Sequence, residues 1–256
     1  MTASGTVLVV ASEDTATAWA SRLVEEGVPA LAVPSSSVAR GPDVERAAVA
    51  LRTAAILPAG PRPVVIVTSR NAVRFLPAAA GAGCSAVVVG EATARAARAA
   101  GFAADAGPGP DSAAGFASVA RRLLAASPAP RAAIWLRGDV ATREGVDLLA
   151  AAGWAIEEFV TYVAVPRPTF ADDVRGAPEA AAWVVGSPAA ARALCAALGA
   201  DAFPPRAGGP RVLVPGDTTA AALAAEGRVV PEIVPGLPEG LGARLRGAGP
   251  TSTTRP

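Results

Sequence analysis

Short apolar runs alternate with longer stretches of helical periodicity along most of the chain. The apolar runs predict β-strands at residues 7–11, 30–33, 64–67, 86–89, 132–136, 155–164, 181–185, 211–214 and 229–233. The periodic stretches predict helices at residues 16–26, 44–57, 71–79, 92–100, 113–126, 140–152, 189–198, 218–226 and 237–245. This alternation favours an α/β protein whose parallel strands are joined by right-handed crossovers.

Repeated turns bear on the number of sheets. Residues 90–93 (Gly-Glu-Ala-Thr) follow one apolar run, and residues 216–219 (Gly-Asp-Thr-Thr) follow another. Further upstream, Thr-Ser at 68–69 is echoed by Gly-Ser at 186–187. The predicted strands could all belong to a single sheet, but a duplicated strand–turn–helix unit favours two flavodoxin-like parallel sheets of four or five strands.

Two proline-containing segments, residues 34–37 and 166–168, are typical of linkers that cross between lobes. One lobe is then expected at residues 38–165, and the other is discontinuous, formed by 1–37 and 166–246. The remaining residues, 247–256, consist largely of Gly, Pro, Ser and Thr, and they are predicted to be a disordered tail.

Composition excludes several classes of function. The chain contains no histidine, which excludes Ser–His–Asp and Cys–His catalysis and histidine metal ligands. No spacing of cysteines or carboxylates indicates a metal site in its place. The net charge of +1 provides no general attraction for nucleic acid or a membrane surface. Cys84 and Cys195 lie among apolar or small residues; buried reduced thiols are the favoured interpretation, and a disulfide or a nucleophile remains open.

No signal peptide is expected at the N-terminus, because an apolar strand pattern starts there without a preceding basic region. No uncharged apolar run has the length needed to cross a bilayer. A cytoplasmic location is therefore the default expectation.

The Gly-x-x-Thr turns are candidate anion sites. Each places a glycine at the end of a predicted strand, Gly90 or Gly216, and a threonine, Thr93 or Thr219, in the first turn of a helix. Free backbone N–H groups and the positive end of the helix dipole favour a carboxylate or phosphate at such a point. The alternative is that each threonine only packs or caps its helix.

Other hydroxyl groups occupy similar positions. Thr68, Ser69 and Ser187 all lie at predicted strand-to-helix turns, where capping is the competing role. In an open α/β sheet the carboxyl ends of the strands line the ligand crevice, so these hydroxyls are expected to face a ligand. Arg137 also ends a strand, and it could pair with a substrate carboxylate or with Asp139.

Tyr162, the single tyrosine, ends the long predicted strand at 155–164. Its phenol is one of few available proton donors in a chain without histidine, although it could equally be an ordinary half-buried strand aromatic.

The order and spacing of these landmarks resemble the uroporphyrinogen-III synthase family. The resemblance covers residues 6 to about 246. It is carried by the segments Val67-Thr-Ser-Arg-Asn-Ala-Val73, Val89-Gly-Glu-Ala-Thr-Ala94, Leu136-Arg-Gly138, Leu149-Ala-Ala-Ala-Gly-Trp154 leading to Tyr162, and Gly216-Asp-Thr-Thr-Ala220.

The resemblance implies two α/β lobes joined by a pair of strands, with one lobe discontinuous. It also implies an enzyme that converts hydroxymethylbilane, a linear tetrapyrrole with eight carboxylates, into uroporphyrinogen III. The reaction loses water, closes the ring and inverts the last pyrrole, and no metal or organic cofactor is expected. The implied partners are this tetrapyrrole and hydroxymethylbilane synthase, which would supply the unstable substrate; nucleic acid and membrane are not expected, and the chain is expected to be a monomer.

The resemblance carries the catalytic role to Tyr162 and substrate binding to Thr68, Ser69, Gly90, Thr93, Ser187, Gly216 and Thr219. Two features depart from the family pattern. Ser12-Glu13 replaces the usual Arg-Pro pair after the first strand, and Gly186 replaces the threonine of the second Thr-Ser turn. These departures leave two alternatives open: a regulatory module that binds a tetrapyrrole or another anion without converting it, and a diverged paralogue in specialised metabolism.

Overall fold

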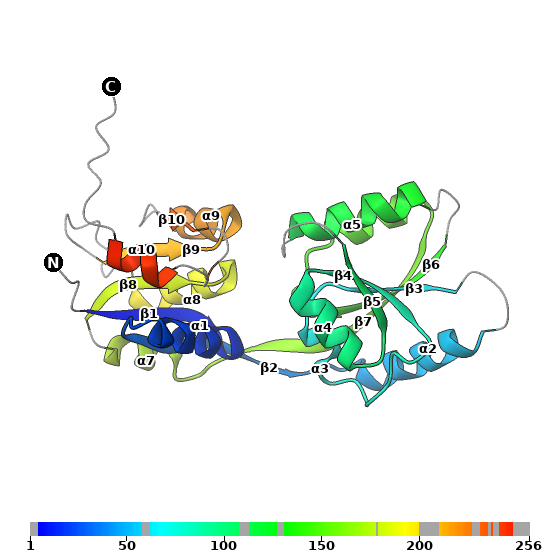
Figure 1. Cartoon of the computed structure of the whole chain (residues 1–256), viewed down its shortest axis with the longest axis horizontal. Coiled ribbons are helices and arrows are strands. Elements are labelled where there is room, and N and C mark those ends of the chain that lie inside the picture. Colours follow the sequence, from blue (N-terminus) through cyan, green and yellow to red (C-terminus); the bar gives the residue numbers. More distant parts are fainter. Residues whose placement is uncertain are drawn as a thin grey trace, which may run out of the picture. The chain divides into compact units, whose positions relative to one another are not determined.

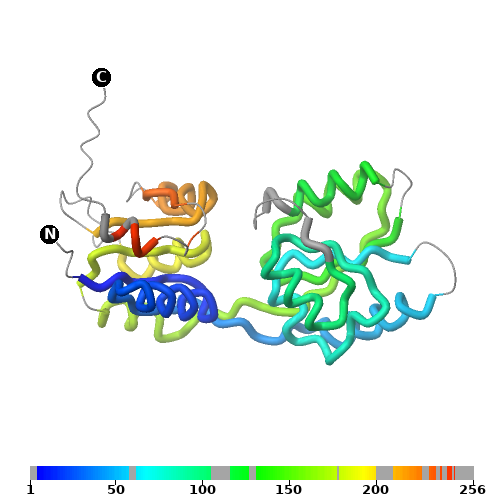
Figure 2. Tube along the Cα trace, in the orientation of Figure 1, coloured from blue at the N-terminus to red at the C-terminus, as the bar shows by residue number. Residues whose placement is uncertain are grey.

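The structure is a computed structural model that describes residues 5–57, 62–107, 113–126, 131–177, 179–199, 210–226, 231–234, 237 and 241–247 (Figure 1). The chain divides into two compact units. Unit 1 comprises Met1–Ser37 and Val165–Pro256, and unit 2 comprises Val38–Ala164. Figure 2 traces how the chain leaves unit 1 through β2 and returns to it through β7.

Unit 1 is built on parallel strands in the order β10-β9-β8-β1-β2. Their bounds are β1 (Thr6–Ser12), β2 (Ala30–Arg40), β8 (Ala180–Val185), β9 (Arg211–Val214) and β10 (Glu232–Ile233). The change of direction in this order falls between β1 and β8, because β1 is followed by β2 on one side and β8 continues the sheet on the other.

Helices cover both faces of the unit 1 sheet. They are α1 (Glu13–Glu25), α7 (Phe170–Gly176), α8 (Pro188–Leu198), α9 (Asp217–Ala225) and α10 (Leu241–Gly247). Strand residues alternate between the faces: Leu8 and Val10 pack with α7, α8 and α9, whereas Val7 and Val9 pack with α1 and α10. Both faces are apolar, as expected for a buried parallel sheet.

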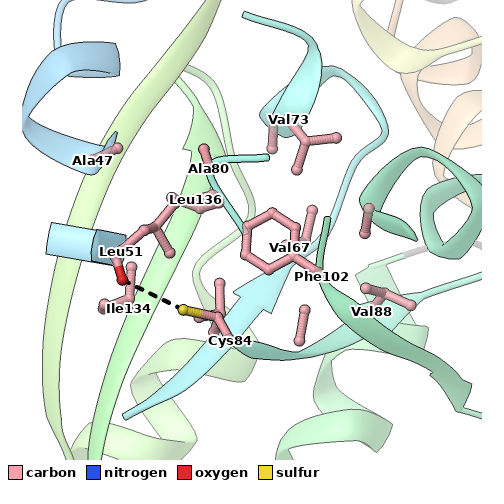
Figure 3. Packing of buried hydrophobic residues seen from close by; sticks show 14 of the residues in the cluster. Ala47, Leu51, Val67, Val73, Ala80, Cys84, Val88, Phe102, Ile134 and Leu136 are labelled. Atoms are coloured by element: carbon pink, nitrogen blue, oxygen red, sulfur yellow. Dashed lines mark hydrogen bonds between the residues drawn. The ribbon is translucent and has the colours of Figure 1, made fainter. Parts of the chain in front are cut away.

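Unit 2 has the strand order β7-β6-β3-β4-β5, again with parallel neighbours. The strands are β3 (Val64–Val67), β4 (Ser85–Val89), β5 (Ala103–Gly107), β6 (Ala132–Gly138) and β7 (Ala155–Pro166), and the helices are α2 (Val44–Ile56), α3 (Asn71–Arg74), α4 (Glu91–Ala99), α5 (Ala113–Ala126) and α6 (Glu144–Ala151). Helices α2, α3 and α4 cover one face and α5 and α6 the other. Figure 3 shows part of the first of these cores, which includes Val67, Cys84, Phe102 and Leu136.

Polar contacts fix β7 within unit 2. The carboxylate of Asp43, just before α2, accepts a hydrogen bond from the Val160 amide at 3.0 Å, and the Asp43 amide donates to the Val160 carbonyl. The hydroxyl of Thr161 is fully buried and donates to the Ala72 carbonyl at 2.7 Å. Gly41 is required here, because a Cβ atom would lie 2.2 Å from the Val160 carbonyl oxygen.

The mixed α/β architecture with parallel strands was predicted correctly, and several elements were not. Strand β5 and helix α7 were missed. Helix α3 ends at Arg74, five residues earlier than predicted. Pro77 cannot donate the backbone hydrogen bond of a continued helix, and Ala79 has a φ of +56°, which lies outside the helical range. Strand β2 runs without a break through residues 34–37, which were predicted as a linker, and Pro166 of the second predicted linker ends β7.

The tail predicted from residue 247 lies outside the described residues, apart from Gly247, which ends α10. Residues 229 and 230 of the last predicted strand also lie outside them. Among the helices that the structure describes, none combines the length and the apolar character needed to span a bilayer.

Candidate functional site

Several predicted site residues lie at the carboxyl edge of unit 2, which comprises the turns after β3, β4 and β6. Thr68 and Ser69 follow β3, Gly90 follows β4, and Gly138 ends β6. Because these strands are parallel neighbours, their carboxyl ends meet at the same edge of the sheet. The sheet order also reverses between β3 and β6, which is where ligands bind in open α/β sheets.

Tyr162 lies against the same edge. Its ring packs directly over Gly138: a Cβ atom at Gly138 would lie 2.6 Å from the ring carbon Cζ and 2.9 Å from the hydroxyl oxygen. The Tyr162 carbonyl accepts a hydrogen bond from the Asp139 amide at 3.2 Å, so the turn after β6 holds this part of β7. The ring is half-buried, and within the described residues the phenol has no hydrogen-bond partner. This phenol can therefore donate a proton to a ligand.

Ser69 and Thr68 are both half-buried. The Ser69 Oγ accepts a hydrogen bond from the Asn71 amide at 3.2 Å, so part of its role is local capping, as the competing interpretation held. A hydroxyl that accepts one bond still has its proton available, so Ser69 can donate to a carboxylate at this edge.

The Gly90 turn has a conformation that requires glycine. Gly90 has φ +78° and ψ 156°, which side chains rarely permit, and helix α4 starts directly after it. Thr93 is only 7% exposed. This burial disagrees with the prediction that its hydroxyl faces a ligand. The amides of Glu91 and Ala92, which have no carbonyl partner within the helix, are the donors that this turn offers.

Ser187 lies at the carboxyl edge of unit 1, which comprises the turns after β1, β8 and β9. Its Oγ accepts a hydrogen bond from the Ala190 amide at 3.1 Å and caps α8. The Gly186 amide donates to the Val10 carbonyl at 2.8 Å, which holds this turn beside the end of β1, where the order of the unit 1 sheet reverses. Glu13 opens helix α1 at the same edge and is exposed.

The Gly216 turn resembles the Gly90 turn in sequence but differs in conformation. Gly216 is fully extended, with φ −179°, and any residue can adopt this backbone. A Cβ atom there would have no neighbour within 4 Å among the described residues. The side chain of Thr219 is 2% exposed, so its hydroxyl, like that of Thr93, is covered by the protein itself. Burial of both threonines disagrees with the prediction that their hydroxyls face a ligand.

Arg137 forms an ion pair with Glu158, which was not among its predicted partners. Its Nε donates to Glu158 at 3.0 Å across neighbouring strands, and its Nη1 donates to the carbonyls of Gly138 and Asp139. The Asp139 carboxylate instead accepts from the Ala164 amide at 3.1 Å. Of the two partners left open for Arg137, the Asp139 carboxylate is therefore not the one it binds. Arg137 fixes the turn on which Tyr162 packs.

Glu158 also binds Arg143, with Nη2 to Oε1 at 2.6 Å. The hydrogen bond from Arg143 and the two positive charges lower the pKa of the Glu158 carboxyl, and partial burial opposes them. Both guanidinium groups also lie over the ring of Trp135, at 5.4 Å and 5.8 Å from its centroid. A pair of acidic residues, 157–158, inside a predicted strand was the signal that could have indicated an ion pair with a neighbouring strand.

A large groove lies elsewhere in unit 2. It has a volume of about 770 Å³ and is lined by α2 and by the amino-terminal halves of β6 and β7. Its lining is mainly apolar, and it includes Val49, Ala133 and Phe159. None of the predicted site residues lines this groove, so its large volume is not evidence that it is the active site.

Both cysteines are free and buried, which confirms the favoured interpretation. Within the described residues, no three His, Cys, Asp or Glu side chains gather in a way that could hold a metal ion.

Comparison with known proteins assigns the family. The sequence model for uroporphyrinogen-III synthase HemD matches residues 17–233. The chain belongs to the uroporphyrinogen-III synthase family. The resemblance drawn from the motifs is thereby confirmed, and uroporphyrinogen-III synthase is the function that this membership supports. No curated protein sequence gives a significant match.

Two solved uroporphyrinogen-III synthase structures share the fold. A mutant enzyme from the extremely thermophilic bacterium Thermus thermophilus is 21% identical, with a TM-score of 0.60 over 95% of this chain and 97% of that chain. Uroporphyrinogen-III synthetase from Helicobacter pylori 26695 is 16% identical, with a TM-score of 0.54 over 90% of this chain and 91% of that chain. At these identities the likeness establishes the mixed α/β fold with its parallel strands.

Proposed function

We propose that this chain is a cofactor-independent uroporphyrinogen-III synthase, a lyase that cyclises hydroxymethylbilane with loss of water and inversion of its last pyrrole ring. The observation that carries the proposal is the family match over residues 17–233. The phenol of Tyr162, which has no partner among the described residues, supplies a proton donor suited to this reaction at the carboxyl edge of unit 2.

We further propose that units 1 and 2 are the two lobes of a flavodoxin-like pair, joined by the strands that cross between them. Numbered along the chain, the strands of unit 1 have the order 2-1-3-4-5 found in flavodoxin, which supports the proposal for that unit. The strands of unit 2 have the order 3-2-1-4-5, which belongs to the other common type of doubly wound sheet. The turns at the carboxyl edge of each unit are the proposed sites for substrate carboxylates.

Carboxylate binding is assigned to backbone amides and to serine and threonine hydroxyls. The first amides of α4, after Gly90, and of α9, after Gly216, have no partner within their helices and lie at the positive ends of the helix dipoles. The hydroxyls of Thr68, Ser69 and Ser187 add donors at the neighbouring turns. Such contacts hold a flexible tetrapyrrole so that the substituted carbon of its last ring meets the reacting centre, and positioning of this kind is worth roughly 7–11 kcal/mol in favourable cases.

Tyr162 is assigned the proton transfer. When the carbon–oxygen bond of the terminal hydroxymethyl group breaks, the phenol donates its proton to the departing oxygen, which leaves as water. The pyrrole nitrogens of the substrate share the positive charge that remains, so the protein needs to supply position and a proton rather than an electron carrier. The substituted ring carbon then attacks to form a spiro intermediate. The bond from this carbon to its methylene bridge breaks and re-forms at the free carbon of the same ring, which loses its proton and so restores the Tyr162 phenol.

A coupled assay tests the proposed activity. Porphobilinogen and its deaminase generate hydroxymethylbilane, this protein is added, and the type I and type III products are separated. Type III product is expected. Type I product alone, from a protein that still binds the tetrapyrrole, would show that the chain is a binding module instead.

A pair of variants tests the role of Tyr162. Tyr162→Phe removes the proton and keeps the ring, so we expect a decrease in kcat with little change in KM, by roughly the 10²–10⁴-fold typical of a lost general acid. Gly138→Ala keeps the phenol but adds a methyl group against its ring, which has to rotate. A matching decrease in kcat supports the observed placement; normal turnover in both variants would remove Tyr162 from the mechanism.

A further inference from the structure

A second, smaller pocket lies at the amino edge of unit 2, which comprises the segments that lead into β3, β4 and β6. It has a volume of about 260 Å³, and its lining includes Arg62, Val64, Gly83, Cys84 and Arg131. Val64 is the first residue of β3, and Arg131 immediately precedes β6. Thr68, Gly90 and Gly138 lie at the other ends of the same strands, so the pocket is separate from the proposed catalytic edge.

Two guanidinium groups line this pocket. The Arg62 Nη1 donates to the Gly83 carbonyl at 3.1 Å, and the Arg131 Nη2 donates to the Arg62 carbonyl at a long 3.5 Å. Among the described residues, the lining contains no acidic side chain. In the part of the chain that the structure describes, neither arginine takes part in an ion pair. Two positive charges therefore share one concave site.

The Nε of Arg131 is buried and has no hydrogen-bond partner in the described part of the chain. A buried donor without a partner is unfavourable by about 1–3 kcal/mol, and by more when the group is charged. Native structures pair nearly all such atoms with protein, water or a ligand. The volume of the pocket is several times the roughly 30 Å³ that one water molecule takes in the liquid, so it accommodates a polyatomic ion.

We propose that this pocket binds a small oxyanion, a phosphate or carboxylate group, between Arg62 and Arg131. The planar fork of a guanidinium group matches the oxygen spacing of either group, so both arginines can donate to one bound ion. Cys84 forms part of the wall, with its Sγ directed to the Leu51 carbonyl at 3.4 Å (Figure 3). Burial raises the pKa of the Cys84 thiol, and the positive charge of Arg62 opposes this increase.

Binding is tested with inorganic phosphate, titrated into the full chain by calorimetry at constant ionic strength set with chloride. One saturable site per chain is expected. Arg131→Gln and Arg62→Gln should each weaken binding by about tenfold or more, which corresponds to about 1.4 kcal/mol. The control Arg192→Gln removes an exposed charge on α8 of unit 1, and Tyr162→Phe alters the other edge of unit 2; both should retain the wild-type affinity. Acetate that competes with phosphate for this site identifies the shared oxyanion chemistry.

Cys84 provides a second readout in the unmodified protein. Phosphate should slow alkylation of Cys84, followed by peptide mass spectrometry, and should leave buried Cys195 of unit 1 unchanged. The proposal is overturned if phosphate shows no saturable binding, if chloride acts equally well, or if phosphate binds without protecting Cys84. None of these outcomes depends on the synthase assay, so a failure of the pocket proposal and a failure of the proposed activity can be told apart.

Discussion

Gly90 and Gly216 each precede a helix in turns of similar sequence but different conformation. Replacing each by alanine tests whether the glycine is needed for the backbone conformation or for substrate binding. At Gly90, φ +78° with ψ 156° lies in a region that is essentially restricted to glycine, so Gly90→Ala should destabilise the protein by about 1–3 kcal/mol. For a chain of this size each kcal/mol lowers Tm by roughly 2–4 °C.

Gly216→Ala should have the opposite effect on stability. The backbone is extended and the added methyl group meets no described atom within 4 Å, so the folded state is unstrained. The unfolded chain loses conformational freedom, which should stabilise the protein by about 0.4–1 kcal/mol. The methyl group nevertheless enlarges the residue that immediately precedes α9, at the turn where the proposed function places a substrate carboxylate.

We therefore expect Gly216→Ala to keep or raise Tm while kcat/KM in the coupled assay falls at least about tenfold, equivalent to about 1.4 kcal/mol of lost transition-state binding. Thermal unfolding and initial rates of type III product formation are measured on the same preparations. Gly90→Ala, which lowers Tm, provides the comparison. An unchanged kcat/KM for Gly216→Ala would refute the assignment of a carboxylate to this turn.

Further predictions concern the surroundings of the site. Thr161→Val leaves the Ala72 carbonyl without its buried partner, so the free energy of unfolding should fall by about 1–3 kcal/mol; an unchanged denaturation midpoint would contradict this. Arg143 holds the pKa of Glu158 below its usual value, so the stabilisation is present above the ordinary carboxyl range and is lost as pH falls through the lowered pKa. Glu158→Gln should thus be destabilising at neutral pH, with a difference from wild type that shrinks in acid. Glu13→Gln removes a negative charge from the carboxyl edge of unit 1, so KM should fall with kcat unchanged; a higher KM would argue against carboxylate binding there.

Hydrophobic periodicity located most elements because a buried parallel strand is nearly continuous in apolar residues. Strands β3 and β9, with the sequences VVIV and RVLV, have the bounds that the pattern predicts. Strand β5, with the sequence AADAG, was missed because it contains no β-branched or aromatic residue and depends on pairing with β4 for its conformation. Helix α7 was missed because it has only 7 residues and directly follows the prolines at 166 and 168, which are typical of a linker.

The site was predicted less completely than the fold. Sequence order placed Ser69, Gly90 and Ser187 at the ends of strands, because turn chemistry is local. It did not indicate that Thr93 and Thr219 are buried, since helix rotation and packing decide which way a first-turn side chain points. The partner of Arg137, Glu158, lies 21 residues away and becomes adjacent only through the pairing of β6 with β7.

The position of unit 2 within the chain has a consequence for synthesis on the ribosome. Strand β1 pairs with β2, which follows it closely, and with β8, which is translated only after all of Val38–Ala164. One side of β1 therefore stays without its partner strand until all of unit 2 has been translated. Completion of the amino-terminal core is thus a late event, and a truncated chain that ends before β8 leaves Leu8 and Val10 without α8 and α9, two of the three helices that pack on them.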